Sequence, residues 1–273
     1  MAISYDEIGN WTEIKLDIVR KYASAYSQIL HNQKAIQRHV YIDAFAGAGK
    51  HISKATHEFV AGSPVNALLV EPAFTEFHFI DLNRGKVKAL IELAGERPNV
   101  TVHEGDCNEI LLNTVFPRCR YEGFARGLCL LDPYAINVDW RVLESAGRMR
   151  TIEIFYNFMI MDANMNVLWR NPEKVAASQI SRMDAAWGDN SWRQAAYVTQ
   201  RGLFGDMEEK ASNTRLIEAF RKRIKDVAKF EYVPDPLPMK NSSGAVVYYL
   251  FFASPNRTGA KIVNEIFNKY RGH

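Results

Sequence analysis

Four short apolar segments of the chain each end in an aspartate, and these aspartates are the residues best placed to do chemistry. They are Asp43 in YIDAFAGAG, Asp81 in FIDLN, Asp106 in EGDCNE and Asp132 in LLDPYA. Ligands of parallel α/β sheets bind beyond the carboxyl ends of the strands. Because each aspartate stands where a predicted strand ends, we expect the four carboxylates to gather at one edge of a sheet.

The first of these segments continues into a glycine turn. Gly47 and Gly49 lack Cβ atoms, so the backbone can turn sharply there and approach a ligand closely, although an ordinary corner would use glycines too. Asp81 adds a second signal, because a carboxylate that ends the second strand can accept from both hydroxyls of a ribose. Asp81 lies farther from the glycines than in a dinucleotide fingerprint, and a loop predicted for residues 50–62 accounts for the extra length.

The third and fourth aspartates differ in what they offer a ligand. Asp106 can accept from the exocyclic amine of an adenine, or it can cap the helix that begins near Asn108. Asp132 is followed by Pro133 and Tyr134, and the proline ends the strand so that the carboxylate and the ring face the cleft. An acid beside an aromatic ring suits a planar substrate that carries an amine. A simple strand-ending turn is the alternative for this tripeptide.

Alternating strand and helix patterns position these acids. The segment from Trp11 to Leu30 has apolar residues at helical spacing, and Ser63 and Pro64 are typical of a helix start. The predicted parallel strands are RHVYIDAF, EFHFIDLN, VTVHEGD, GLCLLDP and RTIEIFYNF. Helical patterns between them predict an α/β fold with a mostly parallel sheet covered on both faces. KFEYVPDPLPM and AVVYYLFFASP, joined by KNSSG, predict an antiparallel hairpin at one edge.

Residues 159–227 interrupt this alternation. The segment carries helical patterns and no convincing strand, which predicts a helical insertion into a core formed by residues 1–158 and 228–273. The chain of 273 residues is long enough for one large domain with such an insertion. Within it, RLIEAFRKRIKDVAK places several cations on one helix, either as a solvated face or as phosphate contacts.

The composition of the chain limits the class of protein to which it can belong. A hydrophobic fraction of 47% and a charged fraction of 24% are typical of a folded globular protein. The net charge of +3 is compatible with a polyanionic partner but does not by itself indicate nucleic acid. The three cysteines form no CxxC pair, so neither a disulfide framework nor a metal site is expected. The sequence contains no apolar run long enough to span a membrane and no signal peptide, which predicts a cytoplasmic protein.

Taken in order, these motifs resemble those of class I S-adenosylmethionine-dependent methyltransferases. More narrowly, WTEIKLDIVRKY, YIDAFAGAG, GSPVNAL, LLDPYAINVDW and YNFMIMDANMNVLWRN resemble the three-Cys-motif partner family, TcmP. The resemblance implies a Rossmann-like sheet and S-adenosylmethionine as cofactor. It places Asp43, Gly47 and Gly49 around the methionine moiety, Asp81 at the ribose and Asp106 at the adenine. The adjoining cofactor-binding residues are Phe45, Leu82 and Cys107.

For the substrate, Asp132-Pro133-Tyr134 is similar to the D/N-P-P-Y/F/W motif of amino-group methyltransferases, with one proline fewer. The resemblance therefore implies that these three residues are catalytic and that the target is an exocyclic amine of a nucleic-acid base. The candidate substrate-binding residues are Lys15, His51, Asn157 and Arg170. Two alternatives stay open: methylation of a small molecule or protein, and a cofactor-binding accessory protein that acts only with a partner, such as one carrying a three-Cys motif.

Overall fold

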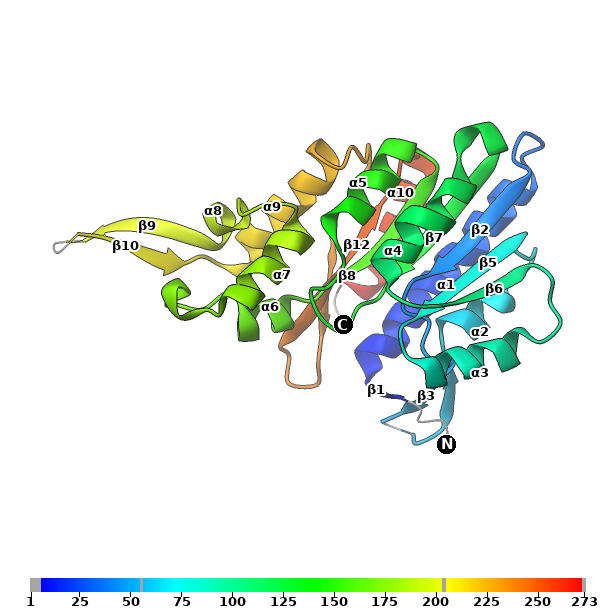
Figure 1. Cartoon of the computed structure of the whole chain (residues 1–273), viewed down its shortest axis with the longest axis horizontal. Coiled ribbons are helices and arrows are strands. Elements are labelled where there is room, and N and C mark those ends of the chain that lie inside the picture. Colours follow the sequence, from blue (N-terminus) through cyan, green and yellow to red (C-terminus); the bar gives the residue numbers. More distant parts are fainter. Residues whose placement is uncertain (1–5, 55, 203–204, 272–273) are drawn as a thin grey trace.

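A seven-stranded sheet forms the centre of the protein in a computed structural model that describes residues 6–54, 56–202 and 205–271 (Figure 1). In spatial order its strands are β11 (Leu237–Lys240), β12 (Val246–Ala253), β8 (Ile152–Phe158), β7 (Ala125–Leu131), β2 (Arg38–Asp43), β5 (Glu76–Asp81) and β6 (Val100–Glu104). Strands β2, β5, β6, β7 and β8 are parallel, whereas β12 is antiparallel to both β8 and β11. The predicted fold class, a mostly parallel sheet with an antiparallel edge hairpin, is confirmed.

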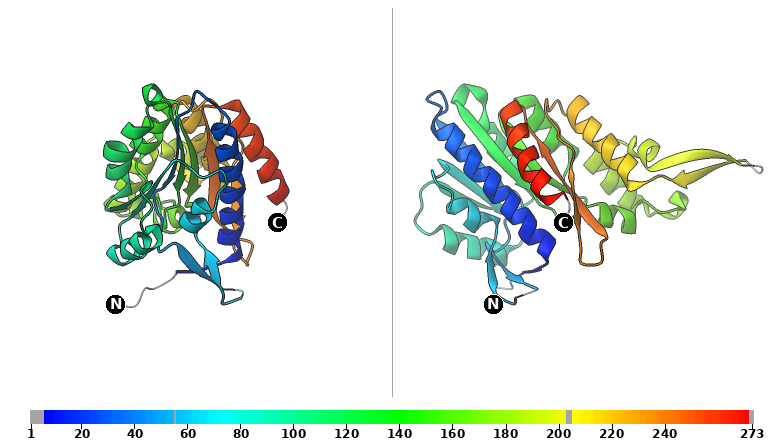
Figure 2. Two further views of the ribbon diagram at one scale, coloured as in Figure 1. Left: turned by 90° about the vertical axis from the view of Figure 1, so that its right-hand side faces the viewer. Right: turned by 180° about the vertical axis from the view of Figure 1, so that it is seen from behind.

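Helices cover both faces of this sheet (Figure 2). One face carries α1 (Asn10–His31), α2 (Ser63–Leu68), α3 (Arg84–Ala94) and α10 (Arg257–Tyr270). The other carries α4 (Cys107–Ile110), α5 (Trp140–Met149), α6 (Ile160–Asn166), α7 (Ala177–Trp187), α8 (Trp192–Ala196) and α9 (Asn213–Asp226). Successive residues of a strand point to opposite faces, so Val40 and Ile42 enter one apolar core and Tyr41 the other. This burial on both faces explains the nearly continuous apolar runs of the parallel strands.

The prediction of a loop over residues 50–62 is wrong. This segment contains β3 (Lys50–Ser53) and β4 (Phe59–Ala61), which pair with each other, and β3 also pairs with β1 (Asp6–Ile8). The pairing with β1 depends on a segment more than forty positions away in sequence (Asp6↔His51), which short apolar patterns do not reveal. Gly62 is the N-cap of α2, so Ser63 is its first helical residue rather than its cap.

The prediction that the insertion contains no strand is also wrong. An antiparallel hairpin of β9 (Tyr197–Gly202) and β10 (Gly205–Lys210) projects from the body of the protein (Figure 1). The helices of this segment pack on the sheet, since the Phe220 ring of α9 lies 4.6 Å from that of Phe158 and 5.4 Å from that of Phe251, centroid to centroid. The insertion boundaries at residues 159 and 227 stay a prediction. In the described part of the chain, no helix combines the length and the apolar character needed to cross a bilayer.

Candidate cofactor and substrate site

The glycine turn after β2 requires glycine at two positions. Gly47 has φ of +64° and Gly49 has φ of +79°, values in the left-handed region that other residues rarely adopt. A Cβ atom on Gly49 would also lie 2.8 Å from Leu93 Cδ2. The turn is therefore fixed by conformation at both glycines and by packing against α3 at the second.

Asp81, at the end of β5, holds this turn in place. Its Oδ2 accepts a 2.9 Å hydrogen bond from the Gly47 N–H, and its Oδ1 accepts a 2.7 Å bond from the Asn83 N–H. Each carboxylate oxygen has a second lone pair, so Asp81 can still accept from ligand hydroxyls. Leu82 follows it with an exposed side chain. The turn and the acid predicted at the ribose are thus parts of one hydrogen-bonded unit.

Asp43 is fully buried at the end of β2. Its Oδ1 accepts from the N–H of Phe45 at 3.3 Å, whereas its Oδ2 has no hydrogen-bond partner among the described residues. Burial raises the pKa of Asp43 to about 7, although the Ser63 hydroxyl and the Phe45 N–H act in the opposite direction. Buried polar atoms normally have partners, so an unpartnered carboxylate oxygen beside a glycine turn indicates a place for a ligand donor.

Asp106 acts as the N-cap of α4, and the ligand role is still available to it. Its Oδ1 accepts from the N–H groups of Asn108 and Glu109, at 2.9 and 3.2 Å. Both bonds go to one oxygen, which leaves Oδ2 of this exposed side chain for a ligand. Cys107 is buried, and burial raises its thiol pKa to about 12, so it is not a thiolate nucleophile.

Asp132, directly after β7, is held from two sides. The Lys15 ammonium of α1 forms an ion pair with its Oδ2, and the Asn157 amide of β8 donates to its Oδ1. Lys15 and Asn157 are themselves buried, while the Asp132 side chain is 26% exposed. The structure therefore joins three predicted site residues from different elements and leaves the carboxylate accessible. In the parallel pairing of β2 with β7, Asp43 lies opposite Leu130, two residues before Asp132, and charge repulsion from Asp132 contributes to the raised pKa of Asp43.

The segment after Asp132 is fixed by a residue from the insertion. Asp162 of α6 accepts from the Ile136 N–H at 3.0 Å and forms a 3.0 Å ion pair with Arg182. Pro133 is buried, whereas Tyr134 is 69% exposed. The Tyr134 hydroxyl accepts from Lys86 of α3 at 3.0 Å. Since β2 lies between β7 and β5, this contact crosses the edge of the sheet above the glycine turn.

Two predicted substrate residues lie away from this carboxylate. The ring of His51, on β3, lies 4.0 Å from the position of a Cβ atom built on Gly47, which places it at the glycine turn. Arg170 is exposed in the insertion. Burial and the positive charge of Arg170 together lower the pKa of Lys210 of β10. Sequence reasoning missed Lys86, because a lysine at ordinary helical spacing carries no signal of its contact with Tyr134.

The basic helix of the insertion, α9, is mostly engaged in structural contacts. Arg223 donates to the Trp187 carbonyl and pairs with Asp189. Arg221 donates to the Val233 carbonyl. Both arginines make intramolecular contacts, which neither predicted alternative, a solvated face or phosphate contacts, describes. Lys222 and Lys225 remain exposed on the same helix.

The residues at this edge fit S-adenosylmethionine. The unpartnered Oδ2 of Asp43 can accept from an ammonium, Asp81 can accept from ribose hydroxyls, and the glycine turn admits a ligand against its backbone. The mostly parallel seven-stranded sheet with the antiparallel β12 near one edge has the architecture of class I methyltransferase structures.

Solved structures include one with a similar overall fold. The chain is similar to protein LPL1258 of Legionella pneumophila, of family DUF519, with a TM-score of 0.51 and 10% identity over 93% of this chain and 91% of that one. It also matches an S-adenosylmethionine-dependent methyltransferase of Mesorhizobium loti, with a TM-score of 0.37 and 8% identity over 85% and 97% of the chains. A third match is TYW2 of M. jannaschii in complex with AdoMet, with a TM-score of 0.36 and 9% identity over 89% and 75%. No protein-family model and no curated protein matches the sequence.

Proposed function

We propose that the protein is an S-adenosylmethionine-dependent methyltransferase that acts on an amine. The observation that supports this most directly is the Asp132 carboxylate, fixed by Lys15 and Asn157 and accessible beside Asp43 and the glycine turn. An accessible acid in a rigid setting can position an amine nucleophile, and positioning is the main contribution that a protein makes to such a transfer.

The cofactor supplies an activated methyl group, and residues of this chain hold it. In the proposed arrangement, Asp43 Oδ2 accepts from its ammonium, Asp81 accepts from its ribose hydroxyls and Asp106 Oδ2 accepts from its adenine amine. The pKa of Asp43, raised to about 7 by burial, falls when a cationic ligand donates to it, because an opposite charge stabilises the carboxylate.

On the substrate side, Asp132 accepts a hydrogen bond from an N–H group of the target amine. This bond orients the lone pair of the amine nitrogen. Asn157 Oδ1 is buried without a partner among the described residues, so it offers a second acceptor close to Asp132. The two acceptors match the two N–H groups of a primary exocyclic amine. Tyr134 presents an exposed ring next to the acid, on which a planar base can stack.

A nucleic-acid base is the proposed substrate class, and the chain is proposed as a TcmP family member whose partner carries the three-Cys motif. The acid, proline and tyrosine in sequence support this class, and a base must then be flipped out of a duplex or presented in a single strand. A small-molecule or protein amine is the second candidate, because the tripeptide has one proline fewer than the base-modifying motif.

Calorimetric titration with S-adenosylmethionine tests the cofactor site. Asp81→Ala removes the acceptor for ligand hydroxyls and releases the Gly47 N–H, and we expect affinity to fall at least about tenfold, since hydrogen bonds to charged groups contribute about 1.5–3 kcal/mol. Glu104→Ala, at the paired position of β6, is the matched control and should bind as the wild type does. No binding by the wild type, or equal binding by Asp81→Ala, would contradict the assignment.

Labelled methyl transfer to DNA, RNA and a cell extract tests the substrate class. We expect incorporation into nucleic acid by the wild type and none by Asp132→Asn, whose side chain keeps its size but loses the negative charge. Label that enters only protein or small molecules would refute the nucleic-acid assignment and leave the amine-methyltransferase assignment standing.

A further inference from the structure

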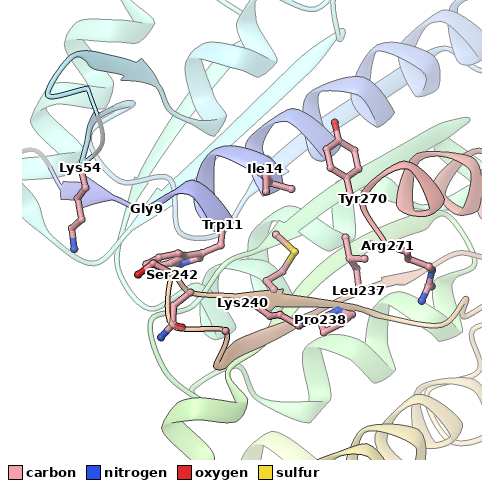
Figure 3. A pocket seen from close by; sticks show the side chains of 13 residues that line it. Gly9, Trp11, Ile14, Lys54, Leu237, Pro238, Lys240, Ser242, Tyr270 and Arg271 are labelled. Atoms are coloured by element: carbon pink, nitrogen blue, oxygen red, sulfur yellow. The ribbon is translucent and has the colours of Figure 1, made fainter. Parts of the chain in front are cut away.

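A large cavity of about 980 Å³ lies between the start of α1, the β11–β12 hairpin and the end of α10 (Figure 3). Its lining includes Trp11, Ile14, Lys54, Lys240 and Arg271. Its floor is apolar, with Leu237 and Met239 of β11 buried beneath it. The volume is at the upper end of the range for drug-sized ligands, so it can admit a nucleotide.

The lining is cationic and aromatic. Lys54, Lys240 and Arg271 contribute positive charges, and among the described residues no aspartate or glutamate lines the cavity. In the part of the chain that the structure describes, neither Lys54 nor Lys240 is paired with a carboxylate, and both are exposed. Arg271 is fixed by a 2.6 Å bond to the Asp235 carbonyl. Unpaired cations over an apolar floor favour an anionic ligand with a flat, apolar part.

The Trp11 ring has a defined position within the cavity. It lies against the backbone of Gly9, where an added Cβ atom would overlap the ring. The Trp11 carbonyl accepts from the Tyr248 hydroxyl of β12 at 3.3 Å, which ties the start of α1 to the sheet. A half-buried tryptophan held in this way can serve as a stacking surface without a large loss of side-chain freedom on binding.

The cavity and the proposed catalytic carboxylate are connected through α1. Trp11 and Lys15 are separated by one turn of α1, about 6 Å along the helix axis, and lie on the same side of it. Lys15 reaches Asp132, whereas Trp11 and Ile14 face the cavity. A nucleic-acid strand that presents a base to Asp132 can therefore extend along the start of α1 toward the cavity.

We propose that this cavity binds a nucleotide flanking the target base in single-stranded nucleic acid. Trp11 stacks on the flanking base, and Lys54 and Lys240 contact the phosphates on either side of it. This inference rests on the proposed function, whose target base lies at Asp132. It adds a binding site that is separate from both the cofactor residues and the catalytic acid.

The test is fluorescence anisotropy with a labelled single-stranded oligonucleotide of about 12 nucleotides, as DNA and as RNA, in the presence of S-adenosylmethionine. We expect Trp11→Ala to weaken binding about tenfold, the effect typical of removing one base-stacking side chain. Gly9→Ala keeps the indole but displaces it, and should weaken binding in the same direction. Trp169→Ala removes an exposed tryptophan outside the cavity and should leave binding unchanged.

The salt dependence of oligonucleotide affinity distinguishes phosphate contacts in the cavity from the effect of the protein's net charge. The double variant Lys54→Gln/Lys240→Gln should reduce the slope of log K against log salt by about 1.4, which is about 0.7 for each phosphate that the protein no longer neutralises. Lys222→Gln/Lys225→Gln removes the same charge from exposed positions of α9 and should leave the slope unchanged. Calorimetric affinity for S-adenosylmethionine, expected to be unchanged in all these variants, verifies that each is folded.

Three results would overturn the inference. The first is oligonucleotide binding that is unaffected by the cavity variants, and the second is an equal weakening of binding in the matched controls. The third is a fluorescent acidic peptide that binds with the same Trp11 dependence while oligonucleotides do not, which would assign the cavity to a protein partner. Asp132→Asn should keep oligonucleotide binding and lose methyl transfer, so failure of the chemistry is distinguishable from failure of the binding site.

Discussion

The ion pair between Lys15 and Asp132 leads to the most specific prediction about this protein. Lys15→Met removes the ammonium but preserves the length and apolar part of the side chain, and leaves the Asp132 carboxylate facing Asp43 without a counter-charge. Asp132→Asn leaves the Lys15 ammonium, 5% exposed, without its partner. Each single variant should therefore lose stability, and the double variant should lose much less than the sum.

The magnitude follows from burial. Breaking a fully buried pair costs about 3–5 kcal/mol, and an exposed pair contributes about 0–1 kcal/mol. Because Lys15 is buried and Asp132 is 26% exposed, we expect each single variant to lose about 2–3 kcal/mol. The coupling energy of the double-mutant cycle should be about 1–3 kcal/mol. Lys15→Met should also lower methyl transfer with little change in affinity for S-adenosylmethionine, because it releases the carboxylate that positions the amine.

Urea denaturation followed by circular dichroism gives the four free energies of unfolding. The matched control is the cycle of Lys21→Met and Asp17→Asn, a more exposed pair on the same helix with an N–O distance of 2.7 Å. That cycle should show coupling of about 0.2–1 kcal/mol. Additivity of the Lys15 and Asp132 variants to within about 0.5 kcal/mol would refute the argument that the pair is buried and coupled.

Three further predictions concern the glycine turn, a buried acid and a buried thiol. Gly49→Ala should lose about 1–2 kcal/mol more stability by urea denaturation than Gly95→Ala, because both glycines have positive φ but only the first has a neighbour, Leu93, that a Cβ would meet. Burial raises the pKa of Glu153 from 4.5 to about 7. Between these two pH values the folded state keeps a proton that the unfolded state loses, so the contribution of Glu153 to the free energy of unfolding falls as the pH rises from about 4.5 to 7. Glu153→Gln should therefore gain about 1–3 kcal/mol relative to the wild type across that range, and parallel pH profiles of the two proteins would contradict this. Cys107, with its thiol pKa raised to about 12 by burial, should resist iodoacetamide at pH 8 by mass spectrometry, and Cys107→Ala should retain methyl transfer.

The sequence alone was sufficient to predict the parallel sheet and the position of the acids at the ends of its strands. Strands buried on both faces require continuous apolar runs, and parallel strands place their carboxyl ends at one edge, so local patterns placed Asp43, Asp81 and Asp132 together. The positive φ values of Gly47 and Gly49 also agree with the need for glycine at that turn. These features depend on residues close in sequence or on the regular geometry of the fold.

Only the tertiary structure decided how the acids are held and what surrounds them. The contacts of Asp132 with Lys15 and Asn157 join α1, β7 and β8, which are distant in sequence, and their energies depend on burial that local patterns do not specify. The β1–β3–β4 sheet depends on pairing with the N-terminal strand, and the β9–β10 hairpin is supported mainly by its own ladder. The cavity beside Trp11 exists because the β11–β12 hairpin, α1 and α10 meet there, and that arrangement is a property of the packed sheet rather than of any segment.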